Sequence, residues 1–172
     1  MIKVFLRIAL AGYFFALGWI LFYQVGATDR KAYFDNPDDH LLPFHTTYNM
    51  FYKAVTQRNT AHGEELRDIL LVNILGNLVL LLPWGMLAPL VFNKLNQVKG
   101  VALSGFLISL TAEVLQFSFS LGVFDIDDLM YNTIGAVFGF YLLKATKYFL
   151  WKNNLGSLNV PKNDKNYTPN QY

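Results

Sequence analysis

The chain has 172 residues, of which 53% are hydrophobic, 16% aromatic and only 15% charged. Soluble domains have about a quarter charged residues, so this composition indicates a membrane protein. The absence of cysteine excludes a disulfide framework and a thiolate metal site, and the net charge of +2 is too small to indicate a nucleic-acid partner.

Four apolar runs are long enough to form membrane-spanning helices, because about 20 residues cross the roughly 30 Å of hydrocarbon. The first run exceeds the ~7–15 apolar residues of a signal peptide, and no A-x-A site follows it, so we expect a retained anchor helix. The predicted spans are residues 4–25, 69–92, 101–123 and 129–151. They predict an all-α membrane protein with four transmembrane helices, in one domain over residues 1–152.

The predicted loop between the first two spans covers about residues 26–68. Within it, apolar residues at helical spacing predict a short helix, with Thr46 or Thr47 as its cap. These residues are Tyr48, Phe51, Tyr52 and Val55. Two interpretations remain open: the aromatic face packs on the ends of the spans, or the helix covers the bundle as a lid that contacts a ligand.

Three small-residue or proline features predict how the spans pack. Pro83 and Gly85 interrupt the second span and predict a kink. Gly135 and Gly139 form a G-x-x-x-G pattern in the fourth span, which indicates a packing face more often than a dimer motif. Gly76 is expected to permit close approach of another helix.

Polar side chains lie inside three of the predicted spans, where an uncompensated charge costs several kcal/mol. With about 1.5 Å of rise per residue, five of them lie in the same half of the membrane, roughly 6 to 13 Å below the surface, and Asp128 stands at the start of the fourth span on the same side. They are Asn73 and Asn77, Glu113 and Gln116, and Asp128 and Asn132. This shared depth predicts one common cluster of ligand-binding residues.

Each polar group also has a structural interpretation. The asparagines can join helices by hydrogen bonds, and Glu113 can be protonated and bonded to Asn77. One of Asp125, Asp127 and Asp128 is expected to cap the fourth span, while the excess of acids favours a site for a cation or a basic group. Glu113 is also a candidate general base, although no nucleophile accompanies it. Any of the three loop histidines, His40, His45 and His62, could approach the cluster, although a solvated position is expected for each.

The distribution of charge predicts the orientation in the membrane. The side of the two termini carries nine basic residues and one acid, whereas the opposite side carries five basic residues and ten acids. By the positive-inside rule both termini are cytoplasmic and the long loop is extracellular. The segment 153–172 is rich in Asn, Lys, Gly and Pro, and is predicted to be a disordered cytoplasmic tail.

The ordered set of polar motifs resembles the VanZ-like family, which takes its name from a teicoplanin-resistance protein. The resemblance covers roughly residues 42–143. Its parts are Leu42-Pro43-Phe44, Asn73-x-x-x-Asn77, Pro83-x-Gly85, Glu113-x-x-Gln116 and Asp125-Ile-Asp-Asp128-x-x-x-Asn132-x-x-Gly135. Many relatives carry an arginine just before the acids, and none stands between Phe117 and Asp128 here. The acids would then need another cation, such as Arg67 or a metal.

The resemblance implies a small multi-pass protein of the cell membrane with a part in resistance to lipoglycopeptides. Three hypotheses follow. The cluster binds the headgroup of a lipid-linked cell-wall precursor or of the antibiotic at the outer leaflet. Alternatively, the protein is an intramembrane hydrolase or transferase, with Glu113 as base and a divalent cation on Asp125 and Asp128. Thirdly, the polar residues only hold a structural or partner-binding bundle together.

Overall fold

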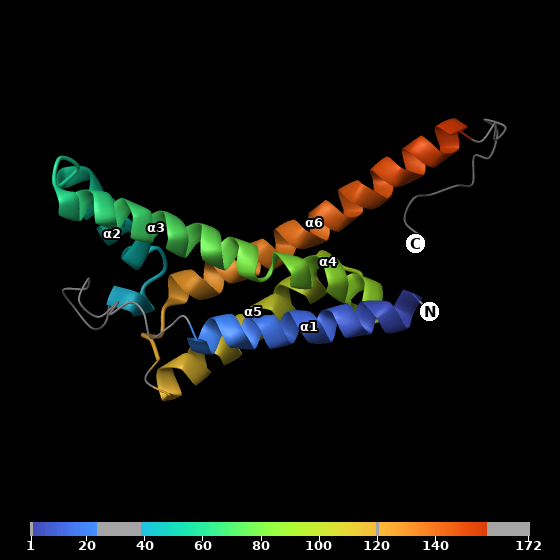
Figure 1. Cartoon of the computed structure of the whole chain (residues 1–172), viewed down its shortest axis with the longest axis horizontal. Coiled ribbons are helices and arrows are strands. Elements are labelled where there is room, and N and C mark those ends of the chain that lie inside the picture. The colour runs from blue at the N-terminus through green and yellow to red at the C-terminus, as the bar shows by residue number, and fades with distance from the viewer. Residues whose placement is uncertain (1, 24–38, 120, 158–172) are drawn as a thin grey trace.

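The computed structural model describes residues 2–23, 39–119 and 121–157 (Figure 1). These residues form helices joined by short connections, and none of the described residues belongs to a β-strand. The elements are α1 (Ile2–Tyr23), η3 (Asp39–Leu41), α2 (His45–Thr56), α3 (Ala61–Leu80), α4 (Leu82–Val91), η4 (Asn93–Leu95), α5 (Val98–Ser118) and α6 (Ile126–Ser157). The prediction of an all-helical protein is confirmed for this part of the chain.

Three helical stretches have the length and apolar composition needed to cross a membrane. They are Lys3–Leu21, Ala61–Val91 and Val98–Ser118. Helix α6 is not one of them, and the predicted fourth span within it includes Lys144 and Lys147 near one end. Four spans and cytoplasmic termini therefore stay predictions. Figure 1 shows the first residues of α1 and the last described residues of α6 towards the same end of the molecule.

The kink predicted in the second span is confirmed. Helix α3 ends at Leu80 and α4 begins at Leu82, with Pro83 in its first turn. The break leaves backbone groups without their helical partners, which is tolerated at membrane depth only when another group satisfies them. Tyr13 of α1 does so, because its hydroxyl donates to the carbonyl oxygen of Leu80 over 2.9 Å.

Glycines bring α6 into backbone contact with α3 and α4. A Cβ at Gly135 would lie 2.0 Å from the Leu78 carbonyl oxygen, and one at Gly139 would lie 2.1 Å from that of Leu82. Both glycines therefore form a packing face within this chain, as predicted. The expectation for Gly76 is wrong, because a Cβ there would meet nothing within 4 Å and the residue is exposed.

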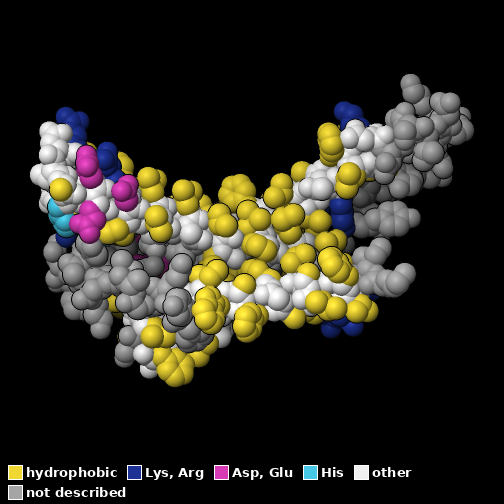
Figure 2. Space-filling view, in the orientation of Figure 1, with side chains coloured by type: hydrophobic (Ala, Val, Ile, Leu, Met, Phe, Trp, Pro, Cys, Tyr) yellow, Lys and Arg dark blue, Asp and Glu magenta, His cyan; other side chains and the backbone are white. Residues whose placement is uncertain are grey.

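The apolar core lies where α1, α4, α5 and α6 meet. Trp84 is its largest member, packed among Leu10, Leu17, Val101 and Phe140. The indole nitrogen of Trp84 donates to the Ser104 hydroxyl over 3.0 Å, so the buried ring leaves no polar atom unsatisfied. Outside this core the helices are covered by apolar side chains, with charged residues gathered towards the two ends (Figure 2).

The predicted loop of residues 26–68 contains more helix than expected. Helix α2 confirms the short helix, and α3 begins eight residues before the predicted span; residues 24–38 lie outside the described part. The orientation of α2 differs from the packing interpretation. Its buried side consists of Thr46, Met50 and Ala54, whereas its four large apolar residues are exposed. The helical spacing of the apolar residues predicted α2 correctly, but it did not predict which side of α2 is buried.

Candidate functional site

The three acids at the start of α6, Asp125 just before the helix and Asp127 and Asp128 in its first turn, each have a separate structural partner. Asp125 is the cap of α6, because its Oδ1 accepts the backbone N–H of Asp127 over 2.9 Å. This confirms that one of the acids caps the fourth predicted span. Capping of α6 needs only one of the three acids. The other two accept hydrogen bonds from groups on α2 and α3, which gives them a structural role as well.

Asp127 caps a different helix from the one in which it lies. Its side chain is fully buried and accepts the backbone N–H of Phe44, the backbone N–H of Thr47 over 2.9 Å and the Thr47 hydroxyl over 2.7 Å. Phe44, the N-cap residue of α2, has a φ of 62°, an uncommon conformation for a non-glycine residue. The expected capping of α2 by Thr46 or Thr47 is therefore wrong, since α6 supplies the carboxylate.

Asp128 joins α6 to α3. The side-chain nitrogen of Asn77 donates to Asp128 Oδ1 and lies 3.5 Å from Asn73 Oδ1. Asn77 thus turns towards the first turn of α6, as the predicted common cluster requires, and Asn73 lies beside it on α3. The amide nitrogen of Asn77 is thus directed at Asp128 and not at Glu113, the partner that the sequence suggested.

Glu113 on α5 holds the start of α6. The residue is only 5% exposed, and its Oε2 accepts the backbone N–H of Asp125 over 3.1 Å. A carboxylate on one helix therefore fixes the residue that caps the next. This contact does not require a proton on Glu113, because the backbone N–H is the donor.

The remaining two predicted site residues differ in their placement. Asn132 is buried one turn below Asp128 and donates to the Ser109 hydroxyl over 3.0 Å, which joins α6 to α5 beneath the acids. Gln116 donates instead to the Leu21 carbonyl oxygen of α1 over 3.3 Å. Its hydrogen bond ties α5 to α1, so the structure does not bring Gln116 to the acids.

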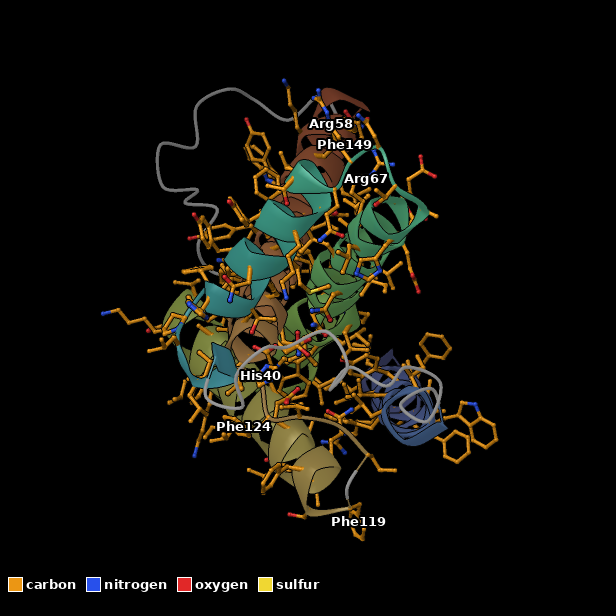
Figure 3. The ribbon with its side chains drawn as sticks, turned by 90° about the vertical axis from the view of Figure 1, so that its left-hand side faces the viewer. His40, Arg58, Arg67, Phe119, Phe124 and Phe149 are labelled. Carbon is orange, nitrogen blue, oxygen red and sulfur yellow. The ribbon has the colours of Figure 1, made fainter. Side chains whose placement is uncertain are left out.

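His40 reaches the acids, and its expected solvated position is wrong. It lies in η3 and is 3% exposed, with its Nδ1 3.7 Å from Asp125 Oδ2. Figure 3 shows it in the middle of this end of the molecule. His62 is exposed beside Glu65, as expected, and His45 is half-buried near Asn49. The neighbouring Leu41 and Leu42 are themselves exposed, so no local signal in the sequence indicated that His40 is buried.

Burial dominates the electrostatics of Asp125. Removal from water, and next the neighbouring Asp128 carboxylate, raise the pKa of Asp125 to about 7. The backbone N–H of Asp127 opposes this rise by stabilising the charged form. Asp125 can therefore exchange a proton near neutral pH. We call His40, Asn77, Glu113, Asp125 and Asp128 the polar cluster.

Neither cation considered from the sequence fits the polar cluster. Arg67 lies 3.8 Å from Glu64, and both side chains are more than half exposed, so Arg67 belongs to the surface of α3. Figure 3 also places it away from His40. Among the described residues, no group of three or more His, Asp or Glu is arranged to hold a metal ion. The divalent site on Asp125 and Asp128 is thus not supported.

Fold and site together define a helical membrane protein with a buried polar cluster at one end. The chain belongs to the VanZ/LLP1 family, whose model matches residues 10–150. Protein VanZ of Enterococcus faecium is 32% identical over 69 residues, which are 40% of this chain and 42% of that protein. The chain thus aligns with less than half the length of this curated relative. No solved structure matches it.

Proposed function

We propose that this VanZ-like protein contributes to resistance against lipoglycopeptides of the teicoplanin type by binding a polar headgroup at the polar cluster. The observation that carries the proposal is the convergence of five buried or half-buried polar residues from η3, α3, α5 and α6 at one end of an otherwise apolar bundle. Membership of the VanZ/LLP1 family supports the link to resistance.

The chemistry of the cluster favours a ligand rich in hydrogen-bond donors. Ionised carboxylates only accept hydrogen bonds, so Glu113, Asp125 and Asp128 suit amide, hydroxyl or ammonium groups. The headgroup of a lipid-linked cell-wall precursor offers such groups, and so does a lipoglycopeptide, whose lipid tail would lie among the membrane lipids. The predicted orientation, with both termini in the cytoplasm, places this end at the outer leaflet of the cell membrane.

The experiment removes single charges while keeping the hydrogen bonds that hold the helices. In Asp128→Asn the side-chain oxygen can still accept from Asn77, and in Glu113→Gln it can still accept from the Asp125 backbone. We expect both variants to insert and melt in detergent like the parent, but to leave the host susceptible to teicoplanin. Glu64→Gln, an exposed acid of α3, is the matched control and should keep resistance.

Two results would contradict the proposal. Full resistance in well-expressed Glu113→Gln and Asp128→Asn would show that the charges do not bind the relevant ligand. Loss of resistance in step with loss of the folded protein would favour the third hypothesis, in which these residues only join helices.

A second candidate, an intramembrane hydrolase or transferase on lipid-linked envelope substrates, is favoured by one observation. The buried His40–Asp125 pair lies directly beside the contact of Glu113 with the Asp125 backbone. Histidine and carboxylate side chains at such positions serve in proton transfer. Purified protein given radiolabelled lipid-linked substrate should then form product, and His40→Gln should abolish it. Absence of product with the parent protein would exclude this candidate for the substrates tested.

A further inference from the structure

Helix α2 exposes the wrong face for a helix in water. Thr46, Met50 and Ala54 are buried, while the large apolar side chains point outward. This aromatic face, as we call it, consists of Tyr48, Phe51, Tyr52 and Val55, which are 63%, 57%, 58% and 49% exposed. A helix on a water-facing surface normally buries its apolar stripe, so some apolar environment must cover this one.

The hairpin of α2 and α3 fixes the level of the aromatic face along the molecule. The two helices pack together, and their backbones are in contact at the hairpin end, where a Cβ on Gly63 would lie 2.1 Å from the Gln57 carbonyl oxygen. At about 1.5 Å of rise per residue, Tyr48 and Val72 both lie roughly 13 Å along their helices from this point. By the same measure Phe51 is level with Ile69, and Val55 with Glu65.

The positions of α3 that are level with the aromatic face run from the charged beginning of α3 into its apolar part. Val72 is 72% exposed within the candidate span Ala61–Val91, so its side chain faces lipid, whereas Glu65 is a charged and exposed residue. The first turn of α2 is also tied to α6, because the Thr47 hydroxyl lies 3.0 Å from the Tyr131 hydroxyl, inside the predicted fourth span. Helix α2 thus passes from hydrocarbon level at Tyr48 to headgroup level and then to water.

We infer that the aromatic face of α2 is a membrane-interface surface whose occupant is the lipid of the bilayer leaflet next to the polar cluster. Tyrosine is enriched at this depth because its ring is apolar and its hydroxyl prefers water. Leu41, Leu42 and Phe44 lie just before α2 in the chain and are further exposed apolar side chains at this end of the molecule. The inference depends on the membrane spans and not on the ligand proposed above.

Lipid fits the aromatic face better than a second copy of the chain does. Helix α3, against which α2 packs, exposes Leu71, Val72 and Leu75, which lie in a candidate membrane span and face lipid for that reason. A protein partner would have to cover both the headgroup-level and the hydrocarbon-level parts of this surface. A bilayer leaflet offers headgroups and hydrocarbon at these two levels, so lipid alone covers both parts of the surface.

The absence of cysteine permits a direct test with single spin labels. Tyr48→Cys, Phe51→Cys and Val55→Cys are labelled in the full chain and reconstituted in vesicles of phosphatidylcholine and phosphatidylglycerol. Val72→Cys provides the lipid reference and Asn59→Cys, at the exposed hairpin tip, the water reference. Relaxation by oxygen, which concentrates in lipid, is compared with relaxation by a water-soluble nickel chelate.

We expect the oxygen-to-nickel ratio to be close to that of Val72 at position 48 and to fall steadily through positions 51 and 55 towards that of Asn59. Unfolding temperatures within a few degrees of the parent show that each labelled variant is folded. Ratios equal to that of Asn59 at all three positions would overturn the inference, because the face would then lie in water. Exclusion of both reagents would also overturn it, since a second copy or another protein would cover the face.

Discussion

The carboxylates of Asp125, Asp127 and Asp128 are close neighbours in the sequence, yet each is held by a different part of the fold. Asp125 caps its own helix, Asp127 caps α2, and Asp128 accepts from Asn77 of α3. Hydrogen bonds from N–H and O–H donors make such burial tolerable, because each donor replaces part of the lost hydration. The start of α6 is therefore the point to which the other elements of this end are attached.

Burial of Asp125 should make the stability of the protein depend on pH. Its folded-state pKa of about 7 lies above the ordinary value of 3.8, so the folded protein binds the proton more tightly than the unfolded chain does. This contribution is complete below the ordinary pKa and is lost as the pH rises through about 7. Between pH 5 and pH 8 the free energy of unfolding should fall by roughly 2 kcal/mol from this group.

Asp125→Asn keeps a capping oxygen but has no titratable proton, so its stability should fall less between these two pH values. Thermal unfolding in detergent at pH 5 and pH 8 measures the difference. Glu113, Asp127, Asp128 and His40 surround the site in both proteins, so the comparison isolates Asp125. An equal fall in parent and variant would show that Asp125 does not carry the effect.

At the scale of elements, the structure is built around α6, which touches α3, α4 and α5 through small residues. Gly135, Gly139 and Gly85 allow backbones to approach so closely that no Cβ fits between them. Close approach through small residues is a main source of attraction between helices in lipid. The broken second span follows from the same arrangement, since α3 and α4 can both lie against α6 only by changing direction at Leu81 and Pro83.

Gly135→Ala should destabilise the protein by roughly 2–4 kcal/mol, because the new methyl group would overlap the Leu78 carbonyl and force the helices apart. Gly76→Ala on the neighbouring helix is the matched control, since nothing lies within 4 Å of the added group. The control should melt at or above the temperature of the parent. Equal melting temperatures for both variants in detergent would contradict this account of the packing.

The sequence predicted the helices well and the contacts of the loop poorly, for a physical reason. Apolar length and the Pro83 signal are local, so three of the predicted spans and the kink could be found. The burial of His40 and the capping of α2 by Asp127 depend on contacts between residues about 80 positions apart, which no local period reveals. The same limit explains α2 itself: a period of 3.6 identifies an apolar face but not whether protein or lipid covers it.

For the candidate site, the useful signal in the sequence was the depth of the polar residues within the predicted spans. Equal depth in three predicted spans correctly brought Asn77, Glu113 and Asp128 to one end, because adjacent antiparallel helices align their ends. It could not show that Gln116, on the same helix as Glu113, turns towards Leu21 of α1. Rotation of a helix about its axis is set by all of its neighbours together, and the sequence of one helix does not contain it.

At the scale of the whole molecule, the predicted orientation can be tested with the same cysteine-free chain. Asn59→Cys at the tip of the α2–α3 hairpin and Lys94→Cys in η4 are both exposed and lie at opposite ends of the α3–α4 stretch. We expect a membrane-impermeant maleimide to label position 59 in intact cells and position 94 only after permeabilisation. Labelling of position 94 in intact cells, with position 59 protected, would reverse the orientation.

The central claim is that the carboxylate of Asp128 acts on a ligand and does more than join α6 to α3. Exchange of the two partners, Asn77→Asp with Asp128→Asn, keeps an amide and a carboxylate in the same hydrogen bond but moves the charge from α6 to α3. We predict that the exchanged protein has the melting temperature of the parent in detergent but leaves its host susceptible to teicoplanin. Retention of both the melting temperature and the resistance would contradict the claim, because the bond between the helices would then be sufficient.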